Sequence, residues 1–222
     1  VSPADEYMVI IFVTPVGPYF KEGFQCTKVA VYREYDRAAL EGFQCTKVAV
    51  YREYDRAAPC GTGRWKVGGN YAAGMGATAR AKEAGYSAAL FLDPKEKKYL
   101  DECGPANFFI IKGNSYITPK SGSILPSITN MSLQQIARDL GMEVEARPIP
   151  LEELAEADEA AECGTAAVTA PISEVVDMDN DVHYVIRKDG SVGPKVTALY
   201  NRLRAIQMGD YPDEHGWVVF VD

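Results

Sequence analysis

The hydrophobic positions along the chain predict an alternation of short strands and amphipathic helices. Apolar residues that alternate with polar ones, or that run unbroken for a few positions, are typical of buried or half-buried strands. We therefore expect strands at residues 7–13, 88–93, 99–102, 107–112, 116–118, 143–147, 160–163, 166–170 and 216–221. Glycine and proline interrupt these runs, with a kink at 103–105, a turn at 94–97 and hairpins at 113–114 and 189–190.

Helices are expected at residues 72–84, 151–157 and 194–208, and in a segment that ends at Gly141. Two of them carry apolar residues at helical spacing, which predicts one buried face on each. These residues are Leu133, Ile136, Ala137 and Leu140 in one helix, and Val196, Leu199, Tyr200, Leu203 and Ile206 in the other. Strands joined by tight turns, together with such helices, indicate an α+β fold with much antiparallel sheet. No linker of low complexity divides the chain.

A tandem repeat interrupts this pattern near the start of the chain. Residues 22–39 read EGFQCTKVAVYREYDRAA, and residues 41–58 repeat the same 18 residues after Leu40. Each copy contains one alternating strand, and a fold built for one such strand has one position for it. We expect the second copy to fill that position, because a short link joins it to the glycine-rich segment at 61–71. The first copy then loops out or adds an edge strand.

Composition and charge exclude some classes of partner. A net charge of −8 argues against nucleic acid, whose phosphates require a basic face. The longest apolar run, at 7–13, is too short to span a bilayer, so no membrane association is expected. Acidic residues gather between 152 and 162, where their spacing predicts a solvated helix face and no metal site. These residues are Glu152, Glu153, Glu156, Asp158, Glu159 and Glu162.

The cysteines predict a reducing compartment. There are five, no CxxC pair occurs, and two of them lie in the repeated sequence. This usage fits free thiols in a cytoplasmic protein better than a disulfide framework. The chain begins with Val1, which leaves a removed targeting segment open.

Four segments contain residue types that suit one chemical site. Lys66 lies among glycines in GTGRWKVGGNY (61–71), and a lysine shielded from water can form a Schiff base with an aldehyde. Glu102 lies at the end of an apolar strand, where a buried carboxylate needs a partner such as a cation. The helix start after Ser127 and the small-residue turn at Thr165 can each bind an anion through backbone N–H groups. Each segment alone also fits a plain structural role: a surface lysine, a strand-end glutamate, an ordinary helix cap or a tight turn.

Taken together, these segments resemble the branched-chain aminotransferases, which are pyridoxal-phosphate enzymes of fold type IV. The resemblance covers nearly the whole chain apart from one repeat copy. It rests on YMVIIFVTPVGPYF (7–20), GTGRWKVGGNY (61–71), ECGPANFF (102–109), SILPSIT (123–129) and GTAA (164–167), in the order of the family. The resemblance implies that residues 1–222 form the large cofactor-binding domain, a mostly antiparallel pseudo-barrel surrounded by helices. It also implies a homodimer whose substrates are small amino acids and 2-oxo acids.

The resemblance assigns roles residue by residue. Lys66 matches the lysine that binds pyridoxal phosphate covalently and moves the substrate proton, and Tyr71 matches the partner of the phenolic oxygen. Glu102 matches the carboxylate that pairs with the ring nitrogen. The remaining matches concern anionic groups: Ile128, Thr129 and Thr165 for the phosphate, and Thr165 with Ala166 for the substrate carboxylate.

The chain also departs from the family pattern. No position matches the smaller N-terminal domain, which supplies an arginine to the phosphate and part of the substrate pocket. We therefore expect weak cofactor binding and poor transamination of leucine, isoleucine and valine with 2-oxoglutarate. The CxxC motif of some members is absent, because Ala166-Ala167-Val168-Thr169 stands there. A D-amino-acid aminotransferase, an aminodeoxychorismate lyase and a non-catalytic structural or dimerising module remain as alternatives.

Overall fold

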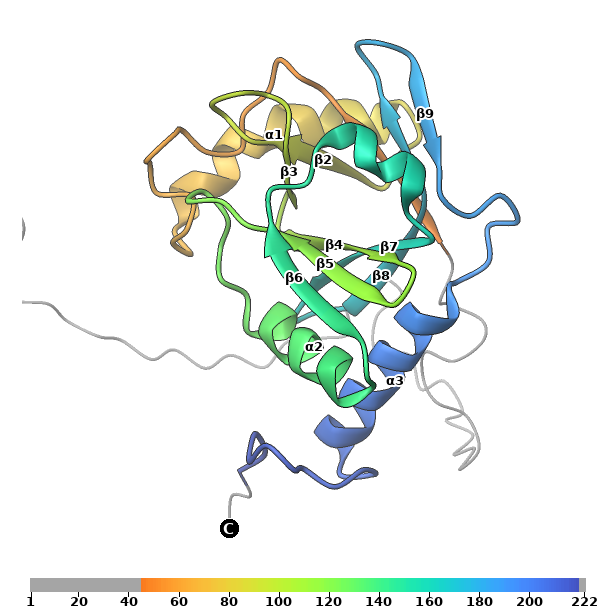
Figure 1. Cartoon of the computed structure of the whole chain (residues 1–222). Helices are drawn as coiled ribbons and strands as arrows, with labels where there is room; N and C mark the ends of the chain where they lie inside the picture. Colours follow the sequence, from red (N-terminus) through yellow and green to blue (C-terminus); the bar gives the residue numbers. More distant parts are fainter. Residues whose placement is uncertain (1–44, 220–222) are drawn as a thin grey trace, which may run out of the picture. The chain divides into compact units, whose positions relative to one another are not determined.

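The computed structural model describes residues 45–219. These residues form a mixed nine-stranded sheet with three α-helices and one 3-10 helix (Figure 1). In chain order the elements are β1 (Thr46–Val50), α1 (Gly68–Glu83), β2 (Ala88–Leu92), β3 (Leu100–Cys103), β4 (Ala106–Lys112), β5 (Ser115–Pro119), α2 (Ile128–Asp139), β6 (Glu143–Arg147), η1 (Leu151–Glu156), β7 (Glu159–Gly164), β8 (Val168–Asp177), β9 (Val182–Val185) and α3 (Pro194–Met208).

Six of the strands close into a barrel. The sheet runs in the order β3-β2-β1-β8-β7-β4, and an additional pairing of β3 with β4 joins its two ends. Strands β5 and β6 extend the sheet from β4, and β9 pairs with β8. Closure removes the unpaired edges that an open sheet would expose. Strand pairing in the described residues is antiparallel except at β1–β2, β1–β8 and β5–β6, so the expected α+β fold with a largely antiparallel pseudo-barrel is confirmed.

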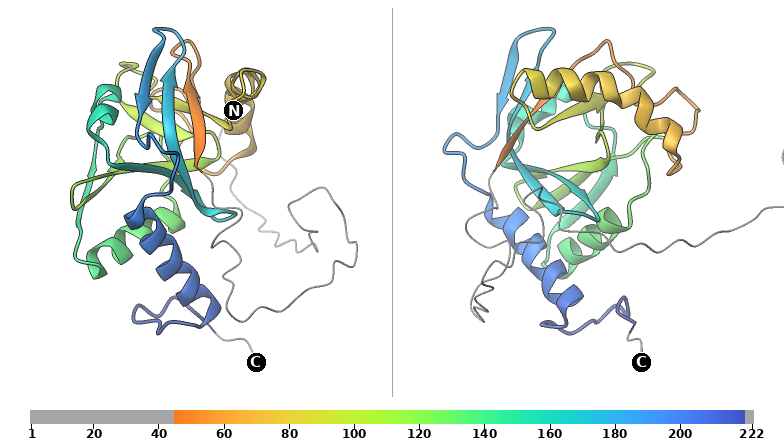
Figure 2. Two further views of the ribbon diagram at one scale, coloured as in Figure 1. Left: turned by 90° about the vertical axis from the view of Figure 1, so that its right-hand side faces the viewer. Right: turned by 180° about the vertical axis from the view of Figure 1, so that it is seen from behind.

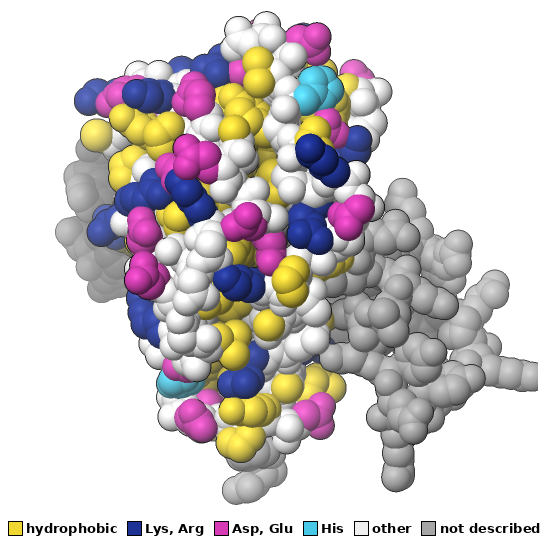
Figure 3. Space-filling view, turned by 45° about the vertical axis from the view of Figure 1, so that its right-hand side comes forward, with side chains coloured by type: hydrophobic (Ala, Val, Ile, Leu, Met, Phe, Trp, Pro, Cys, Tyr) yellow, Lys and Arg dark blue, Asp and Glu magenta, His cyan; other side chains and the backbone are white. Residues whose placement is uncertain are grey.

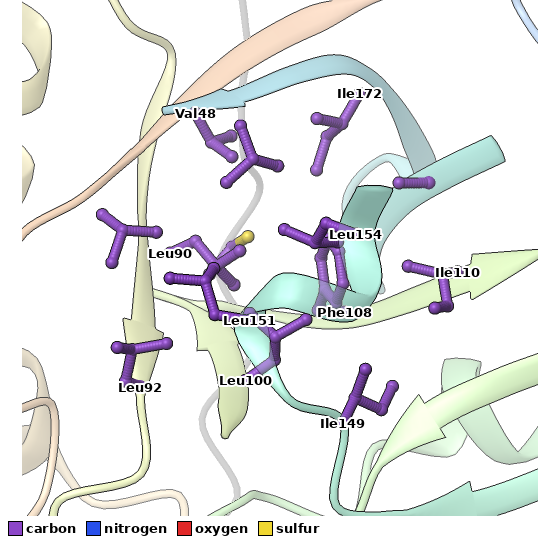
Figure 4. Close-up of a cluster of buried hydrophobic side chains, with 14 of the residues drawn as sticks. Val48, Leu90, Leu92, Leu100, Phe108, Ile110, Ile149, Leu151, Leu154 and Ile172 are labelled. Atoms are coloured by element: carbon purple, nitrogen blue, oxygen red, sulfur yellow. The ribbon is translucent and has the colours of Figure 1, made fainter. Parts of the chain in front are cut away.

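The two-residue period of the strands divides the apolar side chains between two sides of the barrel wall. Phe108 and Ile110 of β4 point into the barrel, where they pack with Leu90 of β2 and Val48 of β1 (Figure 4). Leu154 of η1 adds to the same cluster. The alternate residues of β4, Phe109 and Ile111, belong to a second cluster outside the barrel. A single strand such as β4 is therefore buried on both faces, which explains its unbroken apolar run.

Helices cover the outside of the barrel on two sides. Helices α2 and α3 lie side by side against β7 and its neighbours, and α1 lies on the opposite side against β1 and β2 (Figures 1 and 2). The whole predicted stripe of α3, from Val196 to Ile206, is buried, as is most of the stripe of α2. Leu140 is the exception, with 37% of its surface exposed. It lies beyond the last residue of α2, next to Gly141, whose φ of +75° ends the helix.

Several boundaries differ from expectation. Helix α1 begins at Gly68, four residues before the alanine-rich segment, so the glycines form its first turn. The hairpin between β8 and β9 turns at residues 178–181, whereas Asp189-Gly190 forms only a turn after β9. The strand expected at 216–221 is wrong for residues 216–219, which have no regular structure. In this segment the backbone N–H of Val218 donates a hydrogen bond to the side chain of Asp213 at 2.6 Å, and not to a neighbouring strand.

The acidic segment is also less exposed than expected. Glu159 is 4% exposed, and its carboxylate accepts hydrogen bonds from the N–H groups of Lys195 at 3.1 Å and Val196 at 2.7 Å. It thereby satisfies two free donors at the start of α3, which the sequence spacing could not reveal. Among the described residues, no group of three or more His, Cys, Asp or Glu could hold a metal ion.

The second repeat copy supplies a central strand of the sheet. Its residues 46–50 form β1, which lies between β2 and β8. This is the position that we expected the second copy to fill. The strand at 7–13 and the first copy at 22–39 lie outside the described residues. None of the described helices is long and apolar enough to cross a membrane.

We predict that the barrel interior dominates stability. Ile110→Ala removes a fully buried side chain of β4 and is expected to lower the free energy of unfolding by about 2–5 kcal/mol. Ile128→Ala makes the same chemical change at a side chain that is 74% exposed, and should cost about 0.5 kcal/mol or less. Urea unfolding of both variants without ligand measures the difference. Equal losses would show that the barrel cluster is not the main core.

Candidate active site

A cavity of about 430 Å³ lies between α1, the loop before it and the turn that joins β3 to β4. Residues from two of the predicted segments line it together, namely Lys66 and Tyr71 of the first and Glu102 of the second. Gly104 and Pro105 of the β3–β4 turn form part of the wall. Other lining residues come from the preceding loop, from one face of α1 and from the segment before α2: Arg56, Gly63, Trp65, Asn70, Gly74, Met75, Thr78, Ala79, Lys82 and Leu125.

A side chain of the first turn of α1 holds the loop that carries Lys66 in place. The Asn70 side chain donates to the carbonyls of Thr62 and Trp65, both at 2.8 Å, and accepts from the Thr62 hydroxyl at 2.7 Å. Gly63 packs closely against the next loop, since a Cβ there would lie 2.4 Å from the Ser123 carbonyl oxygen. Gly63 therefore makes the closest backbone approach among the glycines of this segment, whereas Gly68 and Gly69 have open space around them.

Lys66 itself is more exposed than the sequence analysis expected. Its ammonium lies 5.9 Å from the centre of the Tyr71 ring, which is within the range of a cation–π contact. Tyr71 is 47% exposed and Trp65 is 58% exposed. The described residues thus form a floor and one side around the lysine, and they do not remove its amine from water.

Glu102 is buried at the floor of the cavity. It is 3% exposed, and its Oε1 lies 2.8 Å from Nη1 of Arg56, while its Oε2 accepts a hydrogen bond of 2.6 Å from Asn107. Burial raises the pKa of Glu102 to about 7, although the positive charge of Arg56 opposes the increase and the negative charge of Asp101 adds to it. This carboxyl therefore changes charge near neutral pH and would gain from a further cationic partner in the cavity.

Arg56 is the site residue that the sequence analysis missed. Only 6% of its surface is exposed, and it also lies 3.6 Å from the buried carboxylate of Asp101. Asp101 is held by hydrogen bonds from Ser121 at 2.7 Å and Ser123 at 3.0 Å. The Nε atom of Arg56 is buried and has no hydrogen-bond partner. A lone arginine in a repeated strand segment gives no sign of this role, because its acidic partners lie far away along the chain.

The start of α2 has the features expected of an anion site, but it does not line the cavity. Ser127 caps the helix by accepting from the Asn130 N–H at 3.3 Å. Ile128 is 74% exposed and Thr129 is partly exposed, so the N–H groups of this turn are near solvent. The cavity reaches this region through Leu125, whose carbonyl accepts from Asn107 at 3.1 Å.

The turn that contains Thr165 and Ala166 lies at the same end of the barrel as the β3–β4 turn. This follows from register, because Asn107 near the start of β4 pairs with Cys163 near the end of β7. Both Thr165 and Ala166 are exposed, and neither lines the cavity. The structure therefore gathers Lys66, Tyr71 and Glu102 in one cavity and places the two expected anion sites around it.

The residues present fit pyridoxal phosphate. The cavity offers an amine at Lys66, a phenol at Tyr71 and a buried carboxylate with a raised pKa at Glu102. A protonated pyridine nitrogen is a cation of the kind that such a carboxylate lacks. On the face that Figure 3 shows, basic and acidic side chains are interspersed.

Comparison with known proteins decides the family. The model of the family "Amino-transferase class IV" matches residues 10–175. The chain belongs to this family. A chloroplastic branched-chain amino acid aminotransferase of Humulus lupulus is 40% identical over 98% of this chain and 48% of its own length. A branched-chain-amino-acid aminotransferase of Haemophilus influenzae is 41% identical over 100% of this chain and 60% of its own length.

Solved structures of this family share the fold. The Escherichia coli branched-chain amino acid aminotransferase superposes with a TM-score of 0.72 and 30% identity, over 84% of this chain and 58% of that one. The T.th. branched-chain amino acid aminotransferase with pyridoxamine 5′-phosphate gives a TM-score of 0.69 and 30% identity, over 81% of this chain and 56% of that one. This class IV aminotransferase chain spans about half the length of the relatives it matches.

We predict that Glu102 weakens the fold as the pH rises toward neutrality. Its folded pKa of about 7 lies above its ordinary value of 4.5, so its favourable contribution is complete below pH 4.5 and is lost as pH approaches 7. Relative to Glu102→Gln, the chain should lose on the order of 3 kcal/mol of stability across this window. Urea unfolding from pH 4.5 to 7.5 measures the trend, with the exposed Glu96→Gln as the control for removing one surface charge. A difference that grows in the opposite direction would show that Glu102 is stabilised as an anion.

Proposed function

We propose that this chain carries the cofactor site of a pyridoxal-phosphate-dependent transaminase acting on branched-chain L-amino acids. One observation supports it most: a single cavity brings together Lys66, Tyr71 and the buried Glu102–Arg56 pair. The relatives with about 40% identity are branched-chain aminotransferases, and a similar solved structure contains pyridoxamine 5′-phosphate. On this basis leucine, isoleucine or valine would donate the amino group, and 2-oxoglutarate would accept it.

Pyridoxal phosphate supplies an aldehyde that reacts with amines and a ring that withdraws electrons from the substrate carbon. The Nζ atom of Lys66 holds this group and afterwards carries the substrate proton. The exposure of Lys66 to the cavity mouth leaves room for its side chain to move between the two tasks. The hydroxyl of Tyr71, in the wall of the same cavity, would bond the phenolic oxygen.

Glu102 would place a negative charge against the ring nitrogen of the bound cofactor. Arg56 favours the ionised form of this carboxyl, while burial opposes it. A bound pyridinium would add a second cation and draw the carboxyl fully to its ionised state. The fixed contacts to Arg56 and Asn107 hold the carboxylate in place before any ligand arrives, so little reorganisation is needed on binding.

The two anion sites complete the proposal. The N–H groups of Ile128 and Thr129 begin α2, where the helix dipole favours a phosphate, and Thr165 supplies a further contact. The turn at Thr165 and Ala166 would receive the substrate carboxylate through backbone N–H groups. Both sites lie in exposed turns, which leaves their N–H groups available.

We also propose a homodimer in the cytoplasm. Large apolar side chains are exposed around the cavity, with Trp65 at 58% and Met75 at 68%. Exposed apolar groups of this size are typical of surfaces that another protein covers. The four cysteines in the described part of the chain are free thiols, which fits a reducing compartment.

We predict that Lys66 is the only lysine of the cavity that captures the cofactor. Borohydride reduction of the chain with pyridoxal phosphate should fix the cofactor on Lys66, and Lys66→Ala should abolish this labelling. Lys82→Ala is the matched control, because Lys82 lines the same cavity from the other end of the α1 face. Peptide mass mapping locates the label. Equal labelling of Lys66→Ala and the unaltered chain would overturn the assignment.

We predict that the substrate is an L-amino acid with a branched side chain. L-Leucine should convert bound pyridoxal phosphate to pyridoxamine phosphate faster than D-alanine does. Chromatography of the released cofactor measures this half-reaction without the acceptor. A preference for D-alanine would favour a D-amino-acid aminotransferase. Release of pyruvate from aminodeoxychorismate, with the pyridoxal phosphate left unchanged, would point to a lyase.

A further inference from the structure

A chain of buried side-chain amides links Glu102 to the first turn of α2. Asn107 on β4 donates its amide to Oε2 of Glu102 at 2.6 Å. The side-chain carbonyl oxygen of Asn107 accepts a hydrogen bond from the side-chain NH₂ group of Asn130 at 3.0 Å. Asn130 is the third residue of α2, and it is 6% exposed. Two residues that are far apart in sequence thus connect the cavity carboxylate with the helix start that is expected to bind an anion.

The surrounding groups fix the direction of this hydrogen-bond chain. The Asn130 amide also donates to the Thr118 hydroxyl at 2.9 Å, and that hydroxyl donates to the Phe108 carbonyl at 2.9 Å. The side-chain carbonyl oxygen of Asn130 accepts a hydrogen bond from the Tyr116 hydroxyl at 2.9 Å. If the Asn130 amide turned over, its oxygen would face two acceptors, so the observed orientation is the one that satisfies every partner.

The orientation of Asn130 in turn determines that of Asn107. With its oxygen occupied by Asn130, Asn107 presents its NH₂ group to Glu102 and to the Leu125 carbonyl at 3.1 Å. A turned Asn107 would place an oxygen against the Glu102 carboxylate and repel its negative charge. Arg56 contacts the other oxygen of Glu102, and Asp101 lies beyond Arg56, so the charged neighbours do not replace the amide contact.

We propose that Asn130 is a positioning residue that acts through Asn107 to hold Glu102 as an acceptor for the cofactor ring nitrogen. Asn130 lies in the turn that would bind the phosphate, but its side chain is engaged with Asn107, Thr118 and Tyr116 in the buried network. This inference rests on the proposed cofactor site. It concerns the described residues Glu102, Asn107 and Asn130, whose contacts are present without any ligand.

The test compares two ligands in direct binding to the full chain. Pyridoxal phosphate has the ring nitrogen, and 1-deazapyridoxal phosphate has a carbon in its place. Asn130→Ala should weaken binding of pyridoxal phosphate roughly tenfold, the loss expected for one hydrogen bond to a charged group. Binding of the deaza analogue should change about twofold or less, because it makes no contact with Glu102. Fluorescence titration gives both dissociation constants.

Controls separate positioning from general damage. Asn114→Ala makes the same substitution at an exposed site that contacts the Gly141 carbonyl beyond the other end of α2, and both ligands should keep their affinity. If Asn130→Ala does not fold, Asn130→Ser serves in its place, since its hydroxyl is too short to reach Asn107. Equal weakening of both ligands would overturn the positioning role alone. Failure of the unaltered chain to bind pyridoxal phosphate would overturn the cofactor site and this role with it.

Discussion

The pairing of β3 with β4 is the contact on which the rest of the structure depends. It closes six strands into a barrel and so gives the apolar residues of β4 a buried environment on both faces. The same pairing places Glu102 opposite Asn107. Without closure, Glu102 would lie at the open edge of a sheet and would lack its contact with Asn107. The hairpin is therefore both a fold-closing element and the floor of the cavity.

Burial of Glu102 gives the site a fixed carboxyl group, but it disfavours the charged form of that group. Removing Glu102 from water raises its pKa, and the fold offsets this with one arginine and one asparagine. Arg56 is itself buried, and it bridges Glu102 and Asp101. A buried ion pair of this kind adds little to the stability of the fold. It does hold its two side chains in position, because removing either one leaves the other as an unpaired buried charge. A site that must hold a cofactor ring in one orientation benefits from that rigidity.

Local patterns predicted much of this fold. The stripe of α3, the strand at β6 and the apolar run that gives β4 follow from local side-chain patterns, which depend only on neighbouring residues. Errors occurred where a distant group decides the outcome. Glu159 was expected in solvent, but it caps α3 because that helix begins beside β7. The segment after α3 reads as a strand, yet no sheet edge in the described residues pairs with residues 216–219.

The sequence by itself determined the family, through short motifs that follow one another in order along the chain. It also determined most of the elements and the candidate lysine, because each of these rests on residues that are close together. The sequence also indicated Glu102 as a candidate site residue, since a carboxylate in an apolar strand needs a partner. Only the tertiary structure decided what that partner is. Asn107 reaches Glu102 through the pairing of β3 with β4, Arg56 reaches it from the loop between β1 and α1, and Asn130 reaches Asn107 through the packing of α2 on the sheet. Long-range contacts of this kind depend on how elements meet in space, which the spacing of residues along one element does not determine.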